Sequence, residues 1–214
     1  KILRDSPLST ESLRVVRDIF LFQVYTGLAY SDVSKLDAGH IKLGSDGKRW
    51  LHLLRTKTET LTQVPLLPQS EEILQRYSGH QKCLETGKLL PVMTNQVLNR
   101  MLKQVAEEVG LKKSITSHTA RHSFATSVLL GNGVSMETTS RLLGHSNLKV
   151  THVYAKITEN KISQDLELLQ SRFALVQGTA TRLEAADILQ MLGATWMGRS
   201  GVRACVFCLR RPNG

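Results

Sequence analysis

Apolar residues recur at helical spacing in several separate stretches of the chain. The first stretch predicts a helix that Ser9 or Thr10 caps and that Gly27 ends. The apolar positions of this helix follow one another every three or four residues: Leu13, Val16, Phe20 and Val24. A second long helix ends at Gly110, and its apolar positions keep the same spacing: Val97, Met101, Val105 and Val109.

Shorter helices are predicted from the same spacing and from their start signals. A short helix after Ser31 would carry Val33 and Leu36 inward. Pro68 suits the first turn of a helix that continues to about Gly79. Further helices are predicted over residues 118–130, 136–143, 147–155 and 159–171.

Three short stretches have the pattern of β-strands, over residues 41–43, 50–54 and 61–67. Asp46-Gly47 is a turn signal between the first two. Gly131-Asn132-Gly133 would join two of the predicted helices tightly. We therefore predict a mainly α fold with a small three-stranded antiparallel sheet, which is an α+β class.

The character of the chain changes after about Phe173. Only residues 182–192 of this last segment have a helical pattern, and glycines interrupt the rest at Gly178, Gly193, Gly198 and Gly201. At 214 residues the chain is long enough for one full domain and an appendage. We therefore predict a domain over residues 1–172 and a C-terminal tail over residues 173–214.

The chain is strongly basic, with a formal net charge of +10. Such an excess of Lys and Arg favours a polyanionic partner such as DNA or RNA, because these side chains displace counterions from a nucleic-acid backbone. Charge alone does not decide the matter, since many basic proteins bind no nucleic acid. The sequence contains no run of eighteen apolar residues and no apolar signal-peptide core, so we expect no membrane partner.

The three cysteines do not form a disulfide framework, which is consistent with a cytoplasmic protein. Cys205 and Cys208 have the spacing of one half of a zinc site, but no second pair follows them. We therefore expect no metal there.

The stretch from Ser117 to Tyr154 carries the candidate chemistry. It contains His118-x-x-Arg121, then Gly144-His145, then Tyr154. Cationic and hydrogen-bonding groups followed by a hydroxyl nucleophile suit attack on a phosphodiester, because the reaction places negative charge on phosphate oxygens that fixed donors can stabilise.

The order His118-x-x-Arg121, Leu143-Gly144-His145, Tyr154 resembles the catalytic signature of tyrosine recombinases, also called the phage integrase family. Thr26-Gly27-Leu28 and Lys57 extend the resemblance over roughly residues 10–170. The Ala29-Tyr30-Ser31-Asp32 sequence looks most like integrases of mobile elements from Bacteroides-type bacteria.

The resemblance implies the tyrosine recombinase catalytic-domain fold and site-specific DNA recombination, with no metal and no cofactor. It implies double-stranded DNA attachment sites as the partner and other protomers in a tetramer on DNA, in a bacterial, nucleoid-associated setting. Because the chain begins with Lys1 rather than Met, we also expect DNA-gripping domains upstream. The tail at 173–214 would either dock onto a neighbouring protomer or be disordered.

The resemblance also assigns roles to individual residues. Tyr154 would be the nucleophile; a free phenol has a pKa of about 10, so it needs cationic neighbours to react at neutral pH. Arg121 would clamp the phosphate bidentately while projecting from the first turn of its helix. His118 would bind the same phosphate or accept the phenol proton, and His145 would stabilise the phosphate. Lys57 would protonate the departing 5′ oxygen.

One position departs from the family pattern, because Ala29 stands where the family has an arginine after Thr-Gly-Leu. Loss of one transition-state donor typically costs about 10²–10³ in rate. Arg55 is our candidate for the missing cation, since strand alternation would place it on one face with Lys57. We expect Arg55, Lys57, Arg121 and His145 to contact DNA. Asp32 occupies the position of the family's bracing acidic residue.

Parts of the same sequence also suggest three alternatives to a recombinase. His118 and His122 have the i, i+4 spacing of a zinc-binding helix, but Thr119 stands where a zinc protease of that class needs Glu; His122 is therefore expected to pack structurally. A non-catalytic regulator, such as a decayed integrase, could use residues 118–130 and 136–143 as a helix-turn-helix. A type IB topoisomerase would share the chemistry without needing paired protomers.

Overall fold

The computed structural model describes residues 2–145, 147, 149, 151, 154, 166–167 and 169–171. The chain divides into two compact units, residues 1–162 and residues 163–214. The helices and strands described below belong to the first unit. The predicted domain boundary after residue 172 stays a prediction.

The longest helix of the first unit is α2 (Glu11–Thr26), and it begins and ends as its sequence predicts. The Thr10 hydroxyl accepts a hydrogen bond from the Leu13 N–H at 3.3 Å, which satisfies a free donor of the first turn. Gly27 ends the helix at φ 67°, where a side chain would be strained, and its N–H donates to the Gln23 carbonyl at 2.8 Å.

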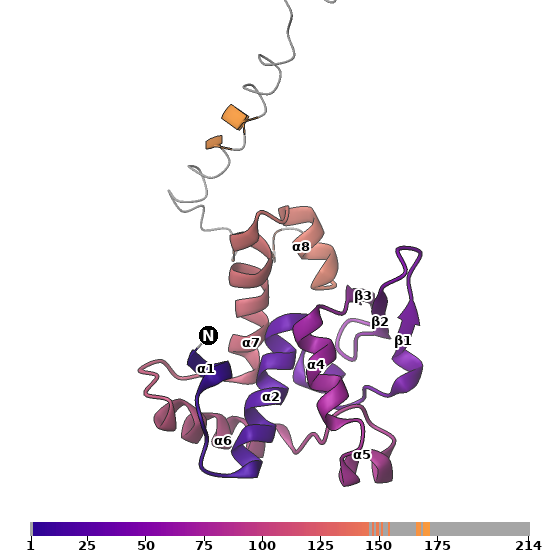
Figure 1. Ribbon diagram of the computed structural model, residues 1–214. Coiled ribbons are helices and arrows are strands. Elements are labelled where there is room, and N and C mark those ends of the chain that lie inside the picture. Colours follow the sequence, from indigo (N-terminus) through magenta and orange to yellow (C-terminus); the bar gives the residue numbers. More distant parts are fainter. Residues whose placement is uncertain are drawn as a thin grey trace, which may run out of the picture. The chain divides into compact units, whose positions relative to one another are not determined.

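Helix α2 lies in the middle of the helical part of the molecule (Figure 1). It contacts α4 (Pro68–Tyr77), α6 (Asn95–Glu108) and α7 (Ser117–Ser123). The shorter helices are α1 (Ile2–Asp5), α3 (Tyr30–Val33), α5 (Gln81–Thr86) and α8 (Met136–Leu142). The core that these elements enclose includes fully buried side chains such as Val16, Ile19, Phe22, Leu98, Leu102 and Leu143.

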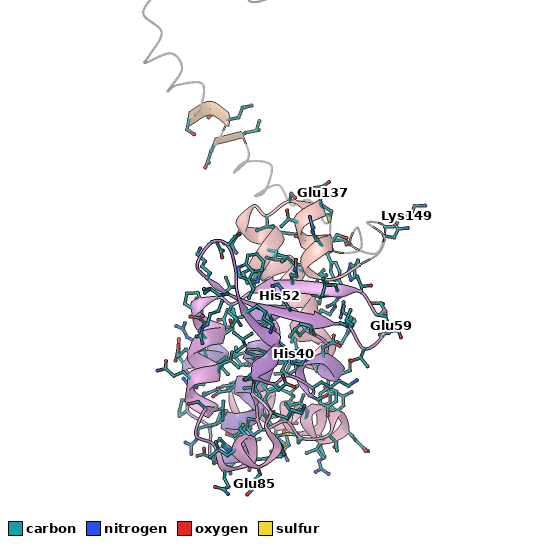
Figure 2. The ribbon with its side chains drawn as sticks, turned by 90° about the vertical axis from the view of Figure 1, so that its right-hand side faces the viewer. His40, His52, Glu59, Glu85, Glu137 and Lys149 are labelled. Atoms are coloured by element: carbon teal, nitrogen blue, oxygen red, sulfur yellow. The ribbon has the colours of Figure 1, made fainter. Side chains whose placement is uncertain are left out.

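The sheet lies to one side of the helices (Figure 1) and has the antiparallel order β1 (Ile41–Leu43), β2 (Arg49–Leu54), β3 (Leu61–Pro65). In its register Leu51 is opposite Val64 and His52 is opposite Gln63. Leu51 and Val64 are buried. His52, the residue after Leu51, lies on the opposite, outer face of the sheet, toward the viewer in Figure 2. This alternation orients the β2–β3 hairpin over the helices.

The predicted architecture is confirmed: the protein is mainly helical with a three-stranded antiparallel sheet. Helix α4 begins at Pro68, and Gly110 adopts φ 69° directly after Val109, the residue that caps the end of α6, as its sequence predicts. Helix α5 was not predicted, because its six residues are too few to establish a periodicity.

The predicted single helix over residues 118–130 is wrong in detail. Helix α7 ends at Ser123 and continues as a π-helical segment, η2 (Phe124–Leu129), and then as a 3₁₀ turn, η3 (Leu130–Asn132). Over only six residues, a pattern of apolar side chains does not distinguish a π-helical segment from an α-helix. The third strand is also shorter than predicted and ends at Pro65. The predicted helices at 147–155 and 159–171 lie largely outside the described residues, as Cys205 and Cys208 do entirely.

Candidate active site

Arg121 is held in the candidate site by several hydrogen bonds. Helix α7 begins with a capping box in which the Thr116 hydroxyl accepts from the Thr119 N–H at 3.2 Å, and Arg121 follows one turn later. Its guanidinium donates to the Gly27 carbonyl at 2.6 Å and to the Leu143 carbonyl at 2.7 Å. The side chain is only 9% exposed, so it does not project from the fold as expected.

His145 lies against Arg121 and has a defined tautomer. Its Nε2 is 3.1 Å from the Arg121 guanidinium, and its Nδ1 is 2.9 Å from the Thr151 hydroxyl. Because a guanidinium can only donate, Nε2 is the acceptor and Nδ1 carries the proton that it donates to Thr151. Burial, and then the positive charges of Arg121 and Arg55, lower the pKa of His145 to about 4. The imidazole is therefore neutral at pH 7.

Tyr154 is half-buried, and two imidazoles flank its ring. The ring of His122 is tilted against it with centroids 5.0 Å apart, and the ring of His145 is stacked with centroids 6.3 Å apart. The Tyr154 N–H donates to the Thr151 carbonyl at 2.9 Å. The structure thus brings the predicted nucleophile beside the predicted His145 and Arg121. Sequence reasoning missed His122 and Thr151 as neighbours of Tyr154, because the spacing of His118 and His122 indicated only structural packing for His122 and no motif marked Thr151.

Arg55, which directly follows strand β2, belongs to the same site. It is 8% exposed, and its Nε and Nη2 lie 3.4 Å from Oδ2 of Asp32, which is 3% exposed. The other carboxylate oxygen of Asp32 accepts from the Thr56 N–H at 2.9 Å. Arg55 also donates to the Leu143 carbonyl, the acceptor that Arg121 uses. Asp32 therefore fixes Arg55 and the start of the hairpin connection together.

The expectation that Arg55 and Lys57 share one strand face is wrong. Strand β2 ends at Leu54, so the alternation of a strand does not extend to either residue. Arg55 turns inward, whereas Lys57 is exposed in the turn that follows. The connection closes where the Arg55 N–H donates to the Thr60 carbonyl at 3.0 Å and where Glu59, at φ 50°, donates its N–H to the Arg55 carbonyl at 2.9 Å. The connection and Glu59 are visible in Figure 2.

Gly144 permits the close approach of the sheet to the segment that carries His145. Its φ is 62°, and a Cβ at this position would overlap Oγ1 of Thr62 and lie 2.7 Å from Cδ of Arg55. A side chain would therefore displace Arg55 or the backbone. The glycine before His145 is required for backbone conformation and for packing.

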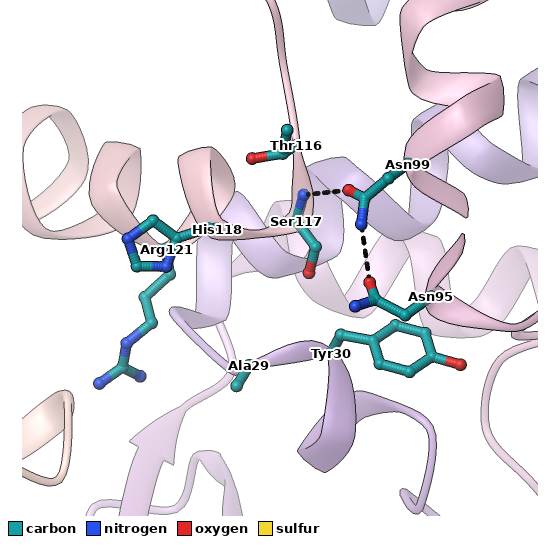
Figure 3. A pocket seen from close by; sticks show the side chains of 8 residues that line it. All are labelled: Ala29, Tyr30, Asn95, Asn99, Thr116, Ser117, His118 and Arg121. Atoms are coloured by element: carbon teal, nitrogen blue, oxygen red, sulfur yellow. Dashed lines mark hydrogen bonds between the residues drawn. The ribbon is translucent and has the colours of Figure 1, made fainter. Parts of the chain in front are cut away.

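His118 and Arg121 border a pocket of about 320 Å³ (Figure 3). Ala29 lines the same pocket, so the position where the family has an arginine opens onto this space. His118 is exposed, unlike Arg121. The remaining lining is mostly polar and consists of Tyr30, Asn95, Asn99, Thr116 and Ser117.

No three His, Cys, Asp or Glu side chains lie close enough to hold a metal ion in the part of the chain that the structure describes. Across those same residues, no helix combines the length and the apolar character needed to cross a membrane.

A comparison with protein families decides the membership. The family described as "Phage integrase family" matches residues 3–161. The chain belongs to the phage integrase family.

Curated relatives of this integrase-family chain are named tyrosine recombinases. It is 31% identical over 173 residues to the tyrosine recombinase XerD of Listeria innocua, which covers 76% of this chain and 57% of the relative. It is 29% identical over 168 residues to XerC of Neisseria meningitidis serogroup B, covering 75% and 54%. The chain thus spans about half the length of the curated relatives it matches.

Solved structures of recombinases have the fold of this integrase-family chain. The XerH recombinase bound to a palindromic difH substrate matches with a TM-score of 0.60 at 18% identity, covering 79% of this chain and 49% of that one. The Tn1549 transposon integrase in complex with transposon right end DNA matches with a TM-score of 0.56 at 19% identity, covering 79% and 63%. These likenesses confirm the predicted catalytic-domain fold. Neither these names nor the curated ones favour the regulator or the topoisomerase.

Proposed function

We propose that this chain is the catalytic domain of a site-specific DNA recombinase that cleaves and rejoins strands through a 3′-phosphotyrosine intermediate. The observation that carries the proposal is that Arg55 and Arg121 converge on the Leu143 carbonyl, with His145 against Arg121 and Tyr154 stacked on His145. Two guanidiniums face one carboxylate, that of Asp32, so the site has an excess of positive charge suited to a phosphate.

The chemical step is a transesterification. The Tyr154 oxygen attacks the scissile phosphorus, a bond from phosphorus to the tyrosine oxygen forms, and the bond from phosphorus to the 5′ oxygen breaks. Lys57 supplies a proton to the 5′ oxygen, which leaves as a hydroxyl. The 5′-hydroxyl of a partner strand then attacks the adduct and releases Tyr154. The adduct retains the energy of the phosphodiester, so the reaction requires neither ATP nor a cofactor.

Each basic residue has a distinct role in this step. Arg121 and Arg55 stabilise the charge on the non-bridging oxygens, and Arg55 supplies the cation that Ala29 lacks. His118, at the mouth of the pocket, donates to the same phosphate or accepts the phenol proton. His145, neutral at pH 7, fixes the Arg121 guanidinium and stacks on the nucleophile. Fixed donors of this kind stabilise the transition state more than water does.

The partner in this proposal is double-stranded DNA at attachment sites, held mainly through its phosphates. The net charge of +10 supports that partner, as do the DNA-bound recombinases of the same fold. Exchange between two sites needs four protomers, so a tetramer on DNA is part of the proposal, within the bacterial nucleoid. The segment 173–214 would be the tail that follows the catalytic domain.

A nicked suicide substrate tests the proposal. Once the strand is cut beside a nick, the short 5′ fragment diffuses away and the covalent adduct accumulates. We expect a protein–DNA band on a denaturing gel that disappears in Tyr154→Phe and persists in Tyr25→Phe, a matched control outside the site. Offered sites should be drawn from the ends of the element that carries the gene.

The same experiment separates the alternatives. A DNA-binding regulator would shift duplex DNA on a native gel and form no covalent band with any site offered. A type IB topoisomerase would form the band and also relax supercoiled plasmid that lacks paired sites. Recombination of two attachment sites on one plasmid, absent in Tyr154→Phe, is the outcome that the proposal predicts.

A further inference from the structure

Gln23 is a polar side chain inside the hydrophobic core. It lies on α2 one turn before Gly27 and is fully buried. Its amide nitrogen donates to the Ser117 hydroxyl at 2.7 Å and to the Leu28 carbonyl at 3.3 Å. Its Oε1 is buried and has no hydrogen-bond partner among the described residues. An unpaired buried oxygen is destabilising, so the contribution of Gln23 lies in the two hydrogen bonds of its amide nitrogen.

The two acceptors of Gln23 belong to different parts of the candidate site. Leu28 lies between Gly27, whose carbonyl holds Arg121, and Ala29, which lines the pocket. Ser117 is the first residue of α7 and directly precedes His118. One amide group therefore bridges the end of α2 and the start of the helix that carries both phosphate-binding residues.

The first turn of α7 has a second attachment, to α6. The Ser117 N–H donates to Oδ1 of Asn99 at 3.0 Å, and Nδ2 of Asn99 donates to Oδ1 of Asn95 at 2.9 Å (Figure 3). Ser117 thus accepts from Gln23 on one side and donates to Asn99 on the other. The network fixes the position of Ser117 relative to α2 and α6 at the edge of the pocket.

We propose that Gln23 is a positioning residue for Arg121 and His118. Through Ser117 it sets the separation between the 27–29 segment and the first turn of α7, so that the Arg121 guanidinium is aimed at the scissile phosphate. Gln23 itself does not touch the substrate. The inference rests on the proposed function, since it assigns a catalytic consequence to a contact in the core.

Gln23→Met tests this, because methionine keeps the length and buried volume of glutamine and removes both hydrogen bonds. We expect the rate of covalent adduct formation at saturating DNA to fall about ten- to hundredfold, the effect of a small misplacement of a catalytic group. DNA affinity should stay within about twofold. The melting temperature should fall only modestly, since removal of the unpaired Oε1 offsets part of the cost of leaving the Ser117 hydroxyl and the Leu28 carbonyl without their donor. A merely structural role would lower the melting temperature without changing the rate of adduct formation.

Two further variants sharpen the test. Ser117→Ala removes the relay hydroxyl and should slow adduct formation to a similar extent. The double variant should be no slower than either single one, because both break the same connection. Ile19→Val is the matched control: it lies on the same helix, is fully buried and is not part of the network, so it should lower stability without changing the rate.

A measurement that needs no cleavage separates this inference from the proposed function. The side-chain Nε–H resonance of Arg121 and the backbone amide of His118 report their positions by NMR, and both should shift or broaden in Gln23→Met but not in Ile19→Val. If the wild type forms adduct and Gln23→Met is equally fast, the positioning role is wrong while the function stands. If no adduct forms but the resonances change, the function is wrong while the connection stands. Unchanged resonances overturn the positioning role in either case.

Discussion

Arg55 and Arg121 donate to the same oxygen, the backbone carbonyl of Leu143, although they come from the sheet and from α7. The two buried guanidiniums repel each other because they meet at one oxygen. Burial, followed by the charge of Arg55, lowers the pKa of Arg121 to about 10. Arg121 nevertheless remains charged at neutral pH. Asp32 compensates one of the two guanidiniums, so the site is completed electrostatically by an added anion such as a phosphate.

Removal of Arg55 should affect stability and catalysis separately. Arg55→Ala leaves the buried Asp32 carboxylate without its partner, which typically costs about 3–5 kcal/mol in the free energy of unfolding. Asp32→Asn added to this variant should recover part of the loss, as measured by urea denaturation.

The catalytic role of Arg55 is tested with Arg55→Lys, which keeps the charge but not the planar fork. We expect adduct formation about 10²–10³ slower, the usual effect of losing one transition-state donor. An Arg55→Ala protein that is folded under the assay conditions and cleaves DNA as fast as wild type would show that Arg55 does not replace the missing arginine.

Gly144→Ala should be much more destabilising than the same change at another left-handed glycine. Gly110 has φ 69° with no atom near a Cβ, so Gly110→Ala incurs only the conformational cost of about 1–2 kcal/mol. Gly144→Ala incurs a similar cost and also the contact with Arg55, so a larger loss is expected in chemical denaturation. Equal losses for the two variants would contradict the close packing at Gly144.

The stability of the protein should fall in acid because of His145. Its pKa is about 4 in the folded state and 6.5 ordinarily, so the unfolded chain binds this proton at the higher pH. The contribution of His145 to the free energy of unfolding is therefore fully present above pH 6.5 and is lost as the pH falls toward 4. His145→Gln retains an acceptor for Arg121 and a donor for Thr151 without the titration. Its melting temperature should fall less than that of wild type between pH 6.5 and 4, and parallel curves would count against the assignment.

Lys57 should become dispensable when the leaving group no longer needs a proton. Lys57→Ala is expected to slow cleavage of ordinary DNA by about 10²–10⁴, the usual contribution of a general acid. A substrate with sulfur at the 5′ bridging position releases a thiolate, whose conjugate acid has a pKa of about 8.5, so the same variant should approach the wild-type rate. Lys48→Ala, in the exposed β1–β2 turn, is the control and should cleave both substrates normally. If sulfur gives Lys57→Ala no advantage, the lysine has another role.

Local sequence signals determined where most elements begin and end. The Thr10 hydroxyl, Gly27 and Pro68 act on backbone groups within a few residues, so a pattern in the sequence is sufficient to locate them. The same argument fails at Phe124–Leu129, where the helix widens without any change in the spacing of apolar residues. Strand alternation failed at Arg55 because the strand ends one residue earlier, at Leu54.

The sequence by itself determined the fold class and the order of the candidate residues, because helix periodicity, turn residues and motif spacing are local properties. Only the tertiary structure decided that Arg121 is buried on two carbonyls, that Arg55 reaches Leu143 and that Gln23 connects α2 to α7. These contacts join residues 22, 88 or 94 positions apart. Their geometry depends on how the sheet and helices pack, and a linear pattern carries no information about packing at such separations.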